Sequence, residues 1–129
     1  MEIRIYYHDT DAGGVVYYAN YLKYLEEART EYLEKRGLSV KAFQERGFFY
    51  AVRKCTITYR SPAVYGDILI CDAILKEVTA AQLIFDQKIY RKTDKNLVVE
   101  AQVSLVCLNR DFRPIQIPSD LKTKLLKAT

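Results

Sequence analysis

The second half of the chain contains four long β-strand patterns joined by connections too short to hold a helix. These patterns are rich in Ile, Val, Tyr and Phe, and they cover residues 48–60, 67–79, 82–92 and 97–108. The connections read SPAVYG, TAA and TDKN, which offer turn residues but no room for a crossover helix. The sequence therefore predicts an antiparallel sheet.

One long amphipathic helix precedes these strands. Apolar residues recur at helical spacing from Tyr21 to Leu33, while charged residues take the remaining face. Asn20 is the expected N-cap of this helix, and Gly37 is the expected stop. Residues 39–47 predict a short second helix with Ser39 as its N-cap.

The ends of the chain add a strand and a short helix. Near the N-terminus, alternation of apolar and charged residues predicts a half-buried strand over residues 2–7, and residues 118–128 predict a terminal helix. With one long helix and about five antiparallel strands, the chain is expected to be a single α+β domain, residues 1–129, whose sheet wraps the helix. Segments such as residues 68–71 are apolar on both faces, so we expect a partner subunit to cover part of the outer face.

The loop before the long helix combines two carboxylates with two glycines. Residues 6–29 read YYHDTDAGGVVYYANYLKYLEEAR. Gly13 and Gly14 allow a tight turn, and the N–H groups at the helix start add a partial positive charge. Asp11 in this setting is either a reactive carboxylate or a turn residue that bonds nearby backbone. The residues alone leave both roles open.

Residues 6–29 resemble the signature of the hotdog-fold thioesterases, in particular the 4-hydroxybenzoyl-CoA thioesterase family and its Tol-Pal-associated acyl-CoA thioesterase branch. The matching residues are Tyr6 or Tyr7, Asp9, Asp11, Gly14, Val15, Val16, Tyr17, Tyr18, Asn20, Tyr21, Glu26, Ala28 and Arg29. The segment YRSPAVYGD at residues 59–67 extends the resemblance, which covers essentially the whole chain. It implies a hotdog fold, in which an antiparallel sheet of about five strands wraps a long central helix.

The resemblance also implies an acyl-CoA thioesterase that releases a free acid and coenzyme A. In that family a loop carboxylate, here Asp11, acts as nucleophile or general base, and the backbone N–H at Tyr18 holds the oxyanion. The implied substrate-binding residues are Gly14, Val15, Val16, Tyr17, Asn20, Tyr59, Ser61 and Pro62. The Tol-Pal branch usually has histidine at the position of Tyr18 and the aryl-CoA branch has tyrosine, so aliphatic and aromatic acyl groups both remain open.

Coenzyme A is part of the implied substrate, and the resemblance implies no other cofactor and no metal. A net charge of +4 suits a phosphate-bearing ligand. Residues 79–81 occupy a turn where the aryl-CoA enzyme presents basic residues to the nucleotide, and here they read Thr-Ala-Ala. Other cations must then hold the phosphates, and the candidates are Arg60, Arg91 and Arg113.

Three residues near the loop have expected supporting roles. Asp9 is expected to order the loop, and Glu26 and Arg29 are expected to pair locally on the helix.

His8 is the only histidine, so the rival hypothesis of a hotdog hydratase or dehydratase would need it as the base. A noncatalytic acyl-CoA-binding protein is the second rival.

Composition excludes several other classes of protein. The cations are spread along the chain, which disfavours nucleic-acid binding, and no apolar run approaches the roughly 18 residues of a membrane span. Cys55, Cys71 and Cys107 lie far apart, as expected of buried reduced thiols. We expect a cytoplasmic protein. The family resemblance implies a homodimer, or a tetramer of two dimers, whose site lies across the dimer interface, so that the partner's residues 59–62 would face Asp11.

Overall fold

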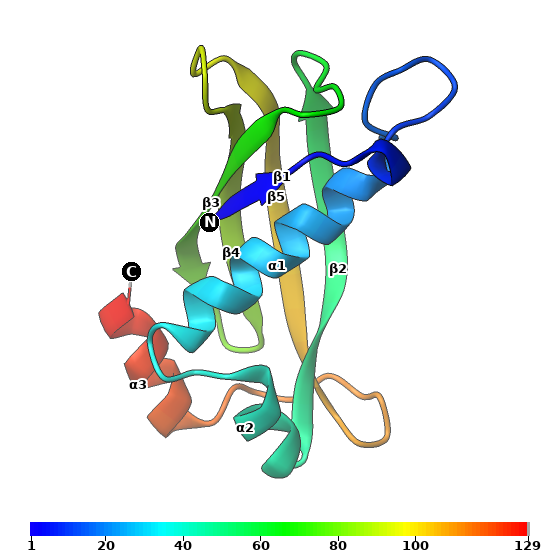
Figure 1. Ribbon diagram of the computed structural model, residues 1–129. Helices are drawn as coiled ribbons and strands as arrows, with labels where there is room; N and C mark the ends of the chain where they lie inside the picture. Colours follow the sequence, from blue (N-terminus) through cyan, green and yellow to red (C-terminus); the bar gives the residue numbers. More distant parts are fainter. Residues whose placement is uncertain (129) are drawn as a thin grey trace.

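A curled antiparallel sheet of five strands wraps one long helix in the computed structural model, which describes residues 1–128 (Figure 1). The strands are β1 (Glu2–Arg4), β2 (Phe48–Tyr59), β3 (Ile68–Val78), β4 (Gln82–Arg91) and β5 (Leu97–Asn109). Their order in the sheet is β1-β3-β4-β5-β2, and every neighbouring pair is antiparallel. The predicted α+β hotdog architecture is confirmed.

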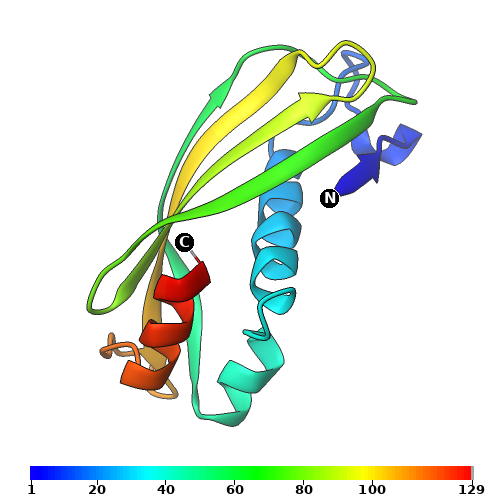
Figure 2. The same cartoon turned by 90° about the vertical axis from the view of Figure 1, so that its left-hand side faces the viewer.

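All helices longer than one turn lie on the inner side of the sheet (Figure 2). They are α1 (Asn20–Glu34), α2 (Val40–Glu45) and α3 (Ser119–Ala128). Gly37 ends α1 as predicted, because its φ of 73° lets the Leu38 N–H return to the Leu33 carbonyl at 2.9 Å. Ser39 caps α2 as predicted, since its hydroxyl accepts from the Ala42 N–H at 3.1 Å.

Two local predictions were wrong near the N-terminus. The first strand ends at Arg4 instead of reaching Tyr7, and a 3-10 helix, η1 (Tyr7–Asp9), follows. Asn20 is not the N-cap of α1, because Ala19 holds that position without a side-chain cap. The Asn20 amide instead donates to Asp9 Oδ1 at 3.2 Å. Asp9 thus accounts for both differences, the early end of the first strand and the change of N-cap residue.

The core divides into two clusters, one at each end of α1. The loop-side cluster surrounds the first turns of α1 and comprises Ile5, Val16, Tyr21, Tyr24, Leu25, Ala28, Ala63, Leu69, Cys71, Ile89, Val98 and Val99. The distal cluster joins the sheet to α2 and α3 and comprises Leu33, Leu38, Phe43, Phe48, Leu75, Leu83, Phe85, Val103, Leu105, Cys107, Ile117, Leu121 and Leu125. We call the corresponding parts of the molecule the loop end and the distal end.

A buried polar pair joins the middle of α1 to the sheet. Arg29 Nη1 donates to Gln87 Oε1 at 3.0 Å, and Gln87 Nε2 donates to the Leu25 carbonyl at 2.9 Å. Burial lowers the pKa of Arg29. Glu26, the expected partner of Arg29, instead accepts from the Thr30 hydroxyl at 3.2 Å.

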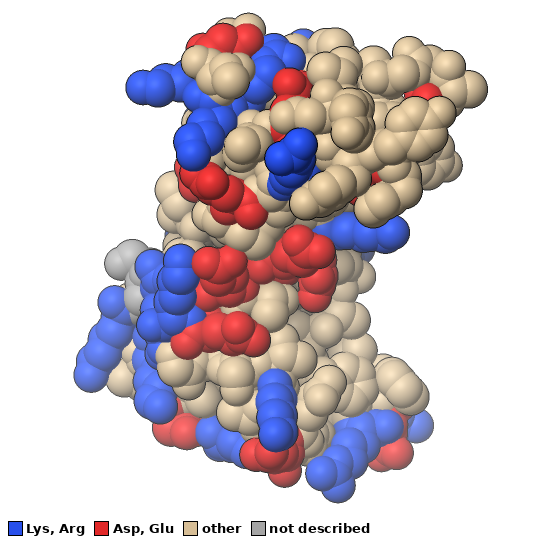
Figure 3. All heavy atoms as spheres, in the orientation of Figure 1, with Lys and Arg blue, Asp and Glu red and all other residues tan. Residues whose placement is uncertain are grey.

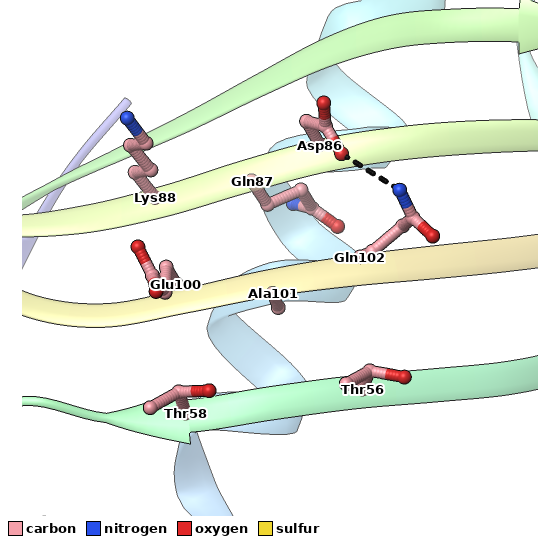
Figure 4. A pocket seen from close by; sticks show the side chains of 8 residues that line it. All are labelled: Thr56, Thr58, Asp86, Gln87, Lys88, Glu100, Ala101 and Gln102. Carbon is pink, nitrogen blue, oxygen red and sulfur yellow. Dashed lines mark hydrogen bonds between the residues drawn. The ribbon is translucent and has the colours of Figure 1, made fainter.

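The outer face of the sheet, away from α1, is polar over its centre and apolar toward β3. Side chains from β2, β4 and β5 form a shallow polar depression there, drawn in Figure 4, which includes Thr56, Thr58, Asp86, Lys88, Glu100 and Gln102. On β3, by contrast, Ile74 is 63% exposed. Only the apolar part matches the expectation that the outer face needs cover.

Two further observations concern the burial of the cysteines and the length of the helices. Cys71 and Cys107 are buried free thiols, and Cys55 is half-buried. Burial raises the pKa of Cys71 to about 12. No helix within residues 1–128 is long and apolar enough to span a membrane.

Candidate active site

A tight loop between η1 and α1 holds the predicted reactive carboxylate. The Asp11 N–H donates to the Val15 carbonyl at 2.9 Å, and the Gly14 N–H returns to the Asp11 carbonyl at 3.0 Å. Gly14 has a φ of 80°, which favours glycine. A Cβ on Gly13 would lie 3.1 Å from Asp11 Oδ1, so the absence of a side chain gives the carboxylate its room.

Asp9 orders this loop, as predicted, and its hydrogen bonds also connect the loop to α1. Its side chain is 12% exposed, and Oδ2 accepts from the Tyr6 N–H at 2.8 Å. Oδ1 accepts from the Tyr24 hydroxyl at 2.8 Å and from the Asn20 amide at 3.2 Å. Burial and this bond to a carboxylate raise the pKa of Tyr24 above its ordinary range. A buried carboxylate with three donors fixes where the loop starts.

Asp11 itself is exposed in the single protomer. Its Oδ1 accepts from the Gly13 N–H at 2.8 Å, the bond expected of a turn aspartate. Within residues 1–128, Oδ2 has no hydrogen-bond partner. One carboxylate oxygen therefore holds the turn, while the other is free to meet a substrate or a water.

A free backbone donor lies at the start of α1. The Asn20 N–H donates to the Tyr17 carbonyl at 2.9 Å, whereas the Tyr18 N–H has no acceptor in the described part of the chain. The Tyr18 carbonyl accepts from the Tyr59 hydroxyl at 3.2 Å, which holds this peptide against the end of β2. An unpaired N–H at a helix start suits a developing negative charge.

An open groove of about 290 Å³ lies beside this donor. It is lined by Val15, Val16, Tyr18, Tyr21, Tyr59, Arg60, Ser61 and Pro62. The predicted substrate-binding residues Val15, Val16, Tyr59, Ser61 and Pro62 therefore come together with Tyr18. Gly14, Tyr17 and Asn20 do not line the groove.

Tyr21 lines the groove but was not predicted to bind substrate, because its helical spacing marked it as core. Its ring lies 5.7 Å from that of Tyr59, and Tyr59 lies 6.2 Å from Tyr18. Burial raises the pKa of Tyr21 to about 12. Three aromatic rings thus form one wall, which suits an apolar acyl group.

The candidate phosphate ligands lie in different places. Arg60 lines the groove and pairs with Glu100, and Arg91 pairs with Asp94 at 3.0 Å. Arg113 lies beyond Asn109, which pairs with the first residue of β2, whereas the groove adjoins the last. These arginines therefore do not form one cluster.

His8, the base that a hydratase or dehydratase would need, lies on the surface outside the groove. The His8 side chain is 81% exposed, and its Nδ1 lies 3.7 Å from Asp9 Oδ1. It is not part of the groove lining. Within residues 1–128, no three His, Cys, Asp or Glu side chains are grouped so that they could hold a metal ion.

Comparison with known proteins identifies the family. The model of the thioesterase-like superfamily matches residues 6–125. An acyl-CoA thioester hydrolase, YbgC of Escherichia coli O6:H1, is 36% identical over 120 residues, which cover 92% of this chain and 89% of the relative.

Solved structures agree with this assignment. A hypothetical protein from Thermus thermophilus is 30% identical, with a TM-score of 0.92 over 100% of this chain and 98% of that one. A 4-hydroxybenzoyl-CoA thioesterase, solved as an aspartate-to-asparagine mutant in complex with 4-hydroxybenzoyl-CoA, is 27% identical, with a TM-score of 0.88 over 97% of this chain and 96% of that one. The chain therefore belongs to the thioesterase-like superfamily of hotdog proteins, as its loop signature predicted.

Proposed function

We propose that this protein is an acyl-CoA thioester hydrolase whose reactive group is Asp11. Support for the substrate class comes from the E. coli relative, an acyl-CoA thioester hydrolase at 36% identity. Support for the role of an aspartate comes from the 4-hydroxybenzoyl-CoA thioesterase, whose asparagine mutant was solved with the thioester. The observation that carries the proposal is the free Tyr18 N–H beside a groove lined by tyrosines.

In the proposed reaction the acyl group lies in the groove and its carbonyl oxygen accepts from the Tyr18 N–H. Asp11 either takes a proton from the water that attacks the carbonyl carbon or attacks that carbon itself. The carbon–sulfur bond then breaks. On the first route the thiolate of coenzyme A takes the proton held by Asp11, and the free acid is released. On the second route the thiolate takes a proton from a water, and the hydroxide so formed hydrolyses the acyl–Asp11 anhydride to the free acid. A general base contributes about 10² to 10⁴ in rate and an oxyanion donor about 10² to 10³.

The proposal includes a second copy of the chain. Asp11 does not line the groove of its own protomer, although its N–H bonds to Val15, which does. Strand β2 is an edge of the sheet, bonded only to β5, and its residue Val52 is 54% exposed. Long free edges invite pairing with another strand. A dimer would bring Asp11 of one protomer to residues 59–62 and the Tyr18 N–H of its partner. Assembly into a tetramer and a cytoplasmic location stay predictions.

Replacement of Asp11 by asparagine tests the mechanism. An asparagine keeps an oxygen that accepts from the Gly13 N–H, so the loop should keep its shape while the charge is lost. We expect Asp11→Asn to lower kcat for thiol release from acyl-CoA by at least about 10². The matched control is Asp111→Asn, an exposed aspartate of the β5–α3 loop, which should keep full activity. Unchanged turnover in Asp11→Asn would refute the assigned role.

The acyl group is identified by a screen of aliphatic acyl-CoA esters of increasing length and of aryl-CoA esters. The wild type should be compared with Tyr18→His, which places the residue usual in the Tol-Pal branch at the groove. We expect this change to shift the preference between aryl and aliphatic esters and to leave the dependence on Asp11 intact. An unaltered preference would show that the Tyr18 side chain does not select the acyl group.

A further inference from the structure

A second cavity, of about 360 Å³, lies at the turn between β4 and β5. It is lined by Ile70, Tyr90, Arg91, Lys92 and Lys95. Ile70 and Tyr90 are directly paired across β3 and β4, one residue out of phase with the inward-facing Leu69 and Ile89. They therefore point to the outer face of the sheet. The cavity thus combines an aromatic and an aliphatic side chain with three cations.

The charges around this cavity are incompletely neutralised. The side chain of Lys95 has no acid partner within residues 1–128. Lys92 Nζ lies 2.7 Å from Glu2 Oε1, but both side chains are about half exposed, and such a pair is weak. Lys and Arg atoms accordingly gather at the upper left of Figure 3, over the β4–β5 turn, where they are positioned to attract an anion.

The cavity adjoins the candidate active-site groove. Arg91 Nη1 donates to the carbonyl of Pro62, a groove residue, at 2.8 Å. Strand β4 lies two strands from β2, a separation of about 10 Å at the usual spacing between strands. The pantetheine arm of coenzyme A, a chain of two amide units with their linkers, spans on the order of 15 Å when extended. A thioester in the groove can therefore have its nucleotide in this cavity.

The β3–β4 turn, at the opposite end of the sheet, offers no such charges. The β3–β4 turn consists of Thr79, Ala80 and Ala81, whereas the β4–β5 turn contains Lys92 and Lys95. Cations that are absent at one turn are thus present at the other, and only the second turn is joined to the groove by a hydrogen bond.

We infer that the β4–β5 cavity binds the nucleotide end of the acyl-CoA substrate, with adenine against Tyr90 and the phosphates on Lys92 and Lys95. The inference rests on the proposed function and names its carrier as coenzyme A. An aromatic ring stacks on any base, and lysine ammonium groups attract phosphate as point charges. The adenine and the phosphates of one ligand therefore account for both the apolar and the charged lining.

The test compares two thioesters with the same acyl group, acyl-CoA and acyl-pantetheine, which lacks the nucleotide. In the double variant Lys92→Glu with Lys95→Glu, we expect KM for acyl-CoA to rise at least tenfold, while kcat changes less than twofold. KM for acyl-pantetheine should stay the same. Adenosine 3′,5′-bisphosphate should bind the wild type and compete with acyl-CoA, and it should not bind the variant.

A matched control reverses the charge of two lysines far from the cavity in the sequence. Lys41→Glu with Lys124→Glu alters two exposed lysines of α2 and α3 and should leave both KM values unchanged. Equal effects of the two double variants, or equal effects on both thioesters, would overturn the inference. So would a lysine-dependent preference for esters of acyl carrier protein without binding of the bisphosphate, since the patch would then dock a protein. Turnover that still depends on Asp11 would leave the proposed function standing in each case.

Discussion

The two ends of the molecule differ in how completely one protomer buries its apolar residues. At the distal end α2 and α3 cover the sheet, and Phe43, Phe85 and Leu125 are at most 1% exposed. At the loop end Tyr7 is 81% exposed and Tyr18 is 62% exposed. Within residues 1–128 the loop end thus carries most of the exposed aromatic rings, a kind of surface that marks interaction sites, whereas the distal end exposes Phe112 at its β5–α3 loop.

This difference assigns separate tasks to the two ends. Packing at the distal end stabilises the fold, and the groove, the free Tyr18 N–H and the proposed reactive carboxylate, Asp11, all lie at the loop end. Changes at the distal end should therefore lower the free energy of unfolding with little direct effect on the chemistry. Changes at the loop end should affect the chemistry first.

The largest effect on stability is expected from Phe85→Ala. Phe85 lies on the inner face of β4, and its ring packs edge-on against that of Tyr32 at 5.5 Å. Removing a buried phenyl ring leaves a cavity, so we expect a loss of about 3–5 kcal/mol in the free energy of unfolding. Urea denaturation followed by circular dichroism, at one protomer concentration, measures it.

Phe112→Ala is the control for this deletion. Phe112 is 75% exposed in the β5–α3 loop and touches the ring of Phe49 edge-on at 5.5 Å, so loss of the same ring should change stability by no more than about 1 kcal/mol. If both variants lost similar stability, the distal cluster would not be the part of the core that holds the fold.

An intermediate effect is expected from Asp9→Asn at the loop end. The side-chain nitrogen of asparagine donates and cannot accept, so at least one of the donors from Tyr6, Tyr24 and Asn20 loses its partner. We expect a loss of about 1–3 kcal/mol in stability, together with at least a tenfold fall in kcat because the Asp11 loop is less well positioned. Steady-state kinetics beside urea denaturation measure both quantities. A variant with full kcat would show that the loop does not depend on Asp9.

The strands were the most predictable part of the fold. Each of the four long strands begins and ends within one residue of its prediction, because alternation of side chains and short turns are local properties. Gly37 and Ser39 were predictable for the same reason, since a helix end depends on a few neighbouring residues.

Both wrong predictions near the N-terminus involve Asp9, whose contact with Asn20 no local pattern reveals. Asp9 accepts from the Tyr6 N–H, which turns the chain after β1, and from Asn20, which lies 11 residues away and would otherwise cap α1. The same limit applies to the site. Its loop residues were predictable from their signature, whereas the cavity at β4–β5 depends on Ile70 and Tyr90 meeting across two strands.

The smallest effect is expected at a buried hydroxyl of the distal end. Tyr50 packs its ring edge-on against Phe43 at 5.0 Å, and its hydroxyl is buried without a hydrogen-bond partner in the described chain. Tyr50→Phe removes that unsatisfied group and keeps the ring. We therefore expect stability at pH 7 to stay the same or rise by up to about 1 kcal/mol.

Alkaline pH should enlarge this difference in a definite direction. Burial raises the pKa of Tyr50 above its ordinary value of about 10. The folded state then holds a proton that the unfolded state releases, so the wild type loses stability above pH 10, by up to about 1.4 kcal/mol per pH unit from this group. Tyr50→Phe lacks this loss, so urea denaturation should show that its gain in stability over the wild type is larger at pH 11 than at pH 7.

The control is Tyr65→Phe, which changes an exposed tyrosine of the loop end and should show no gain in stability at either pH. A Tyr50→Phe variant less stable than the wild type at pH 7 would mean that the hydroxyl has a bound partner such as a water, and that the distal end is less tightly closed than its packing indicates.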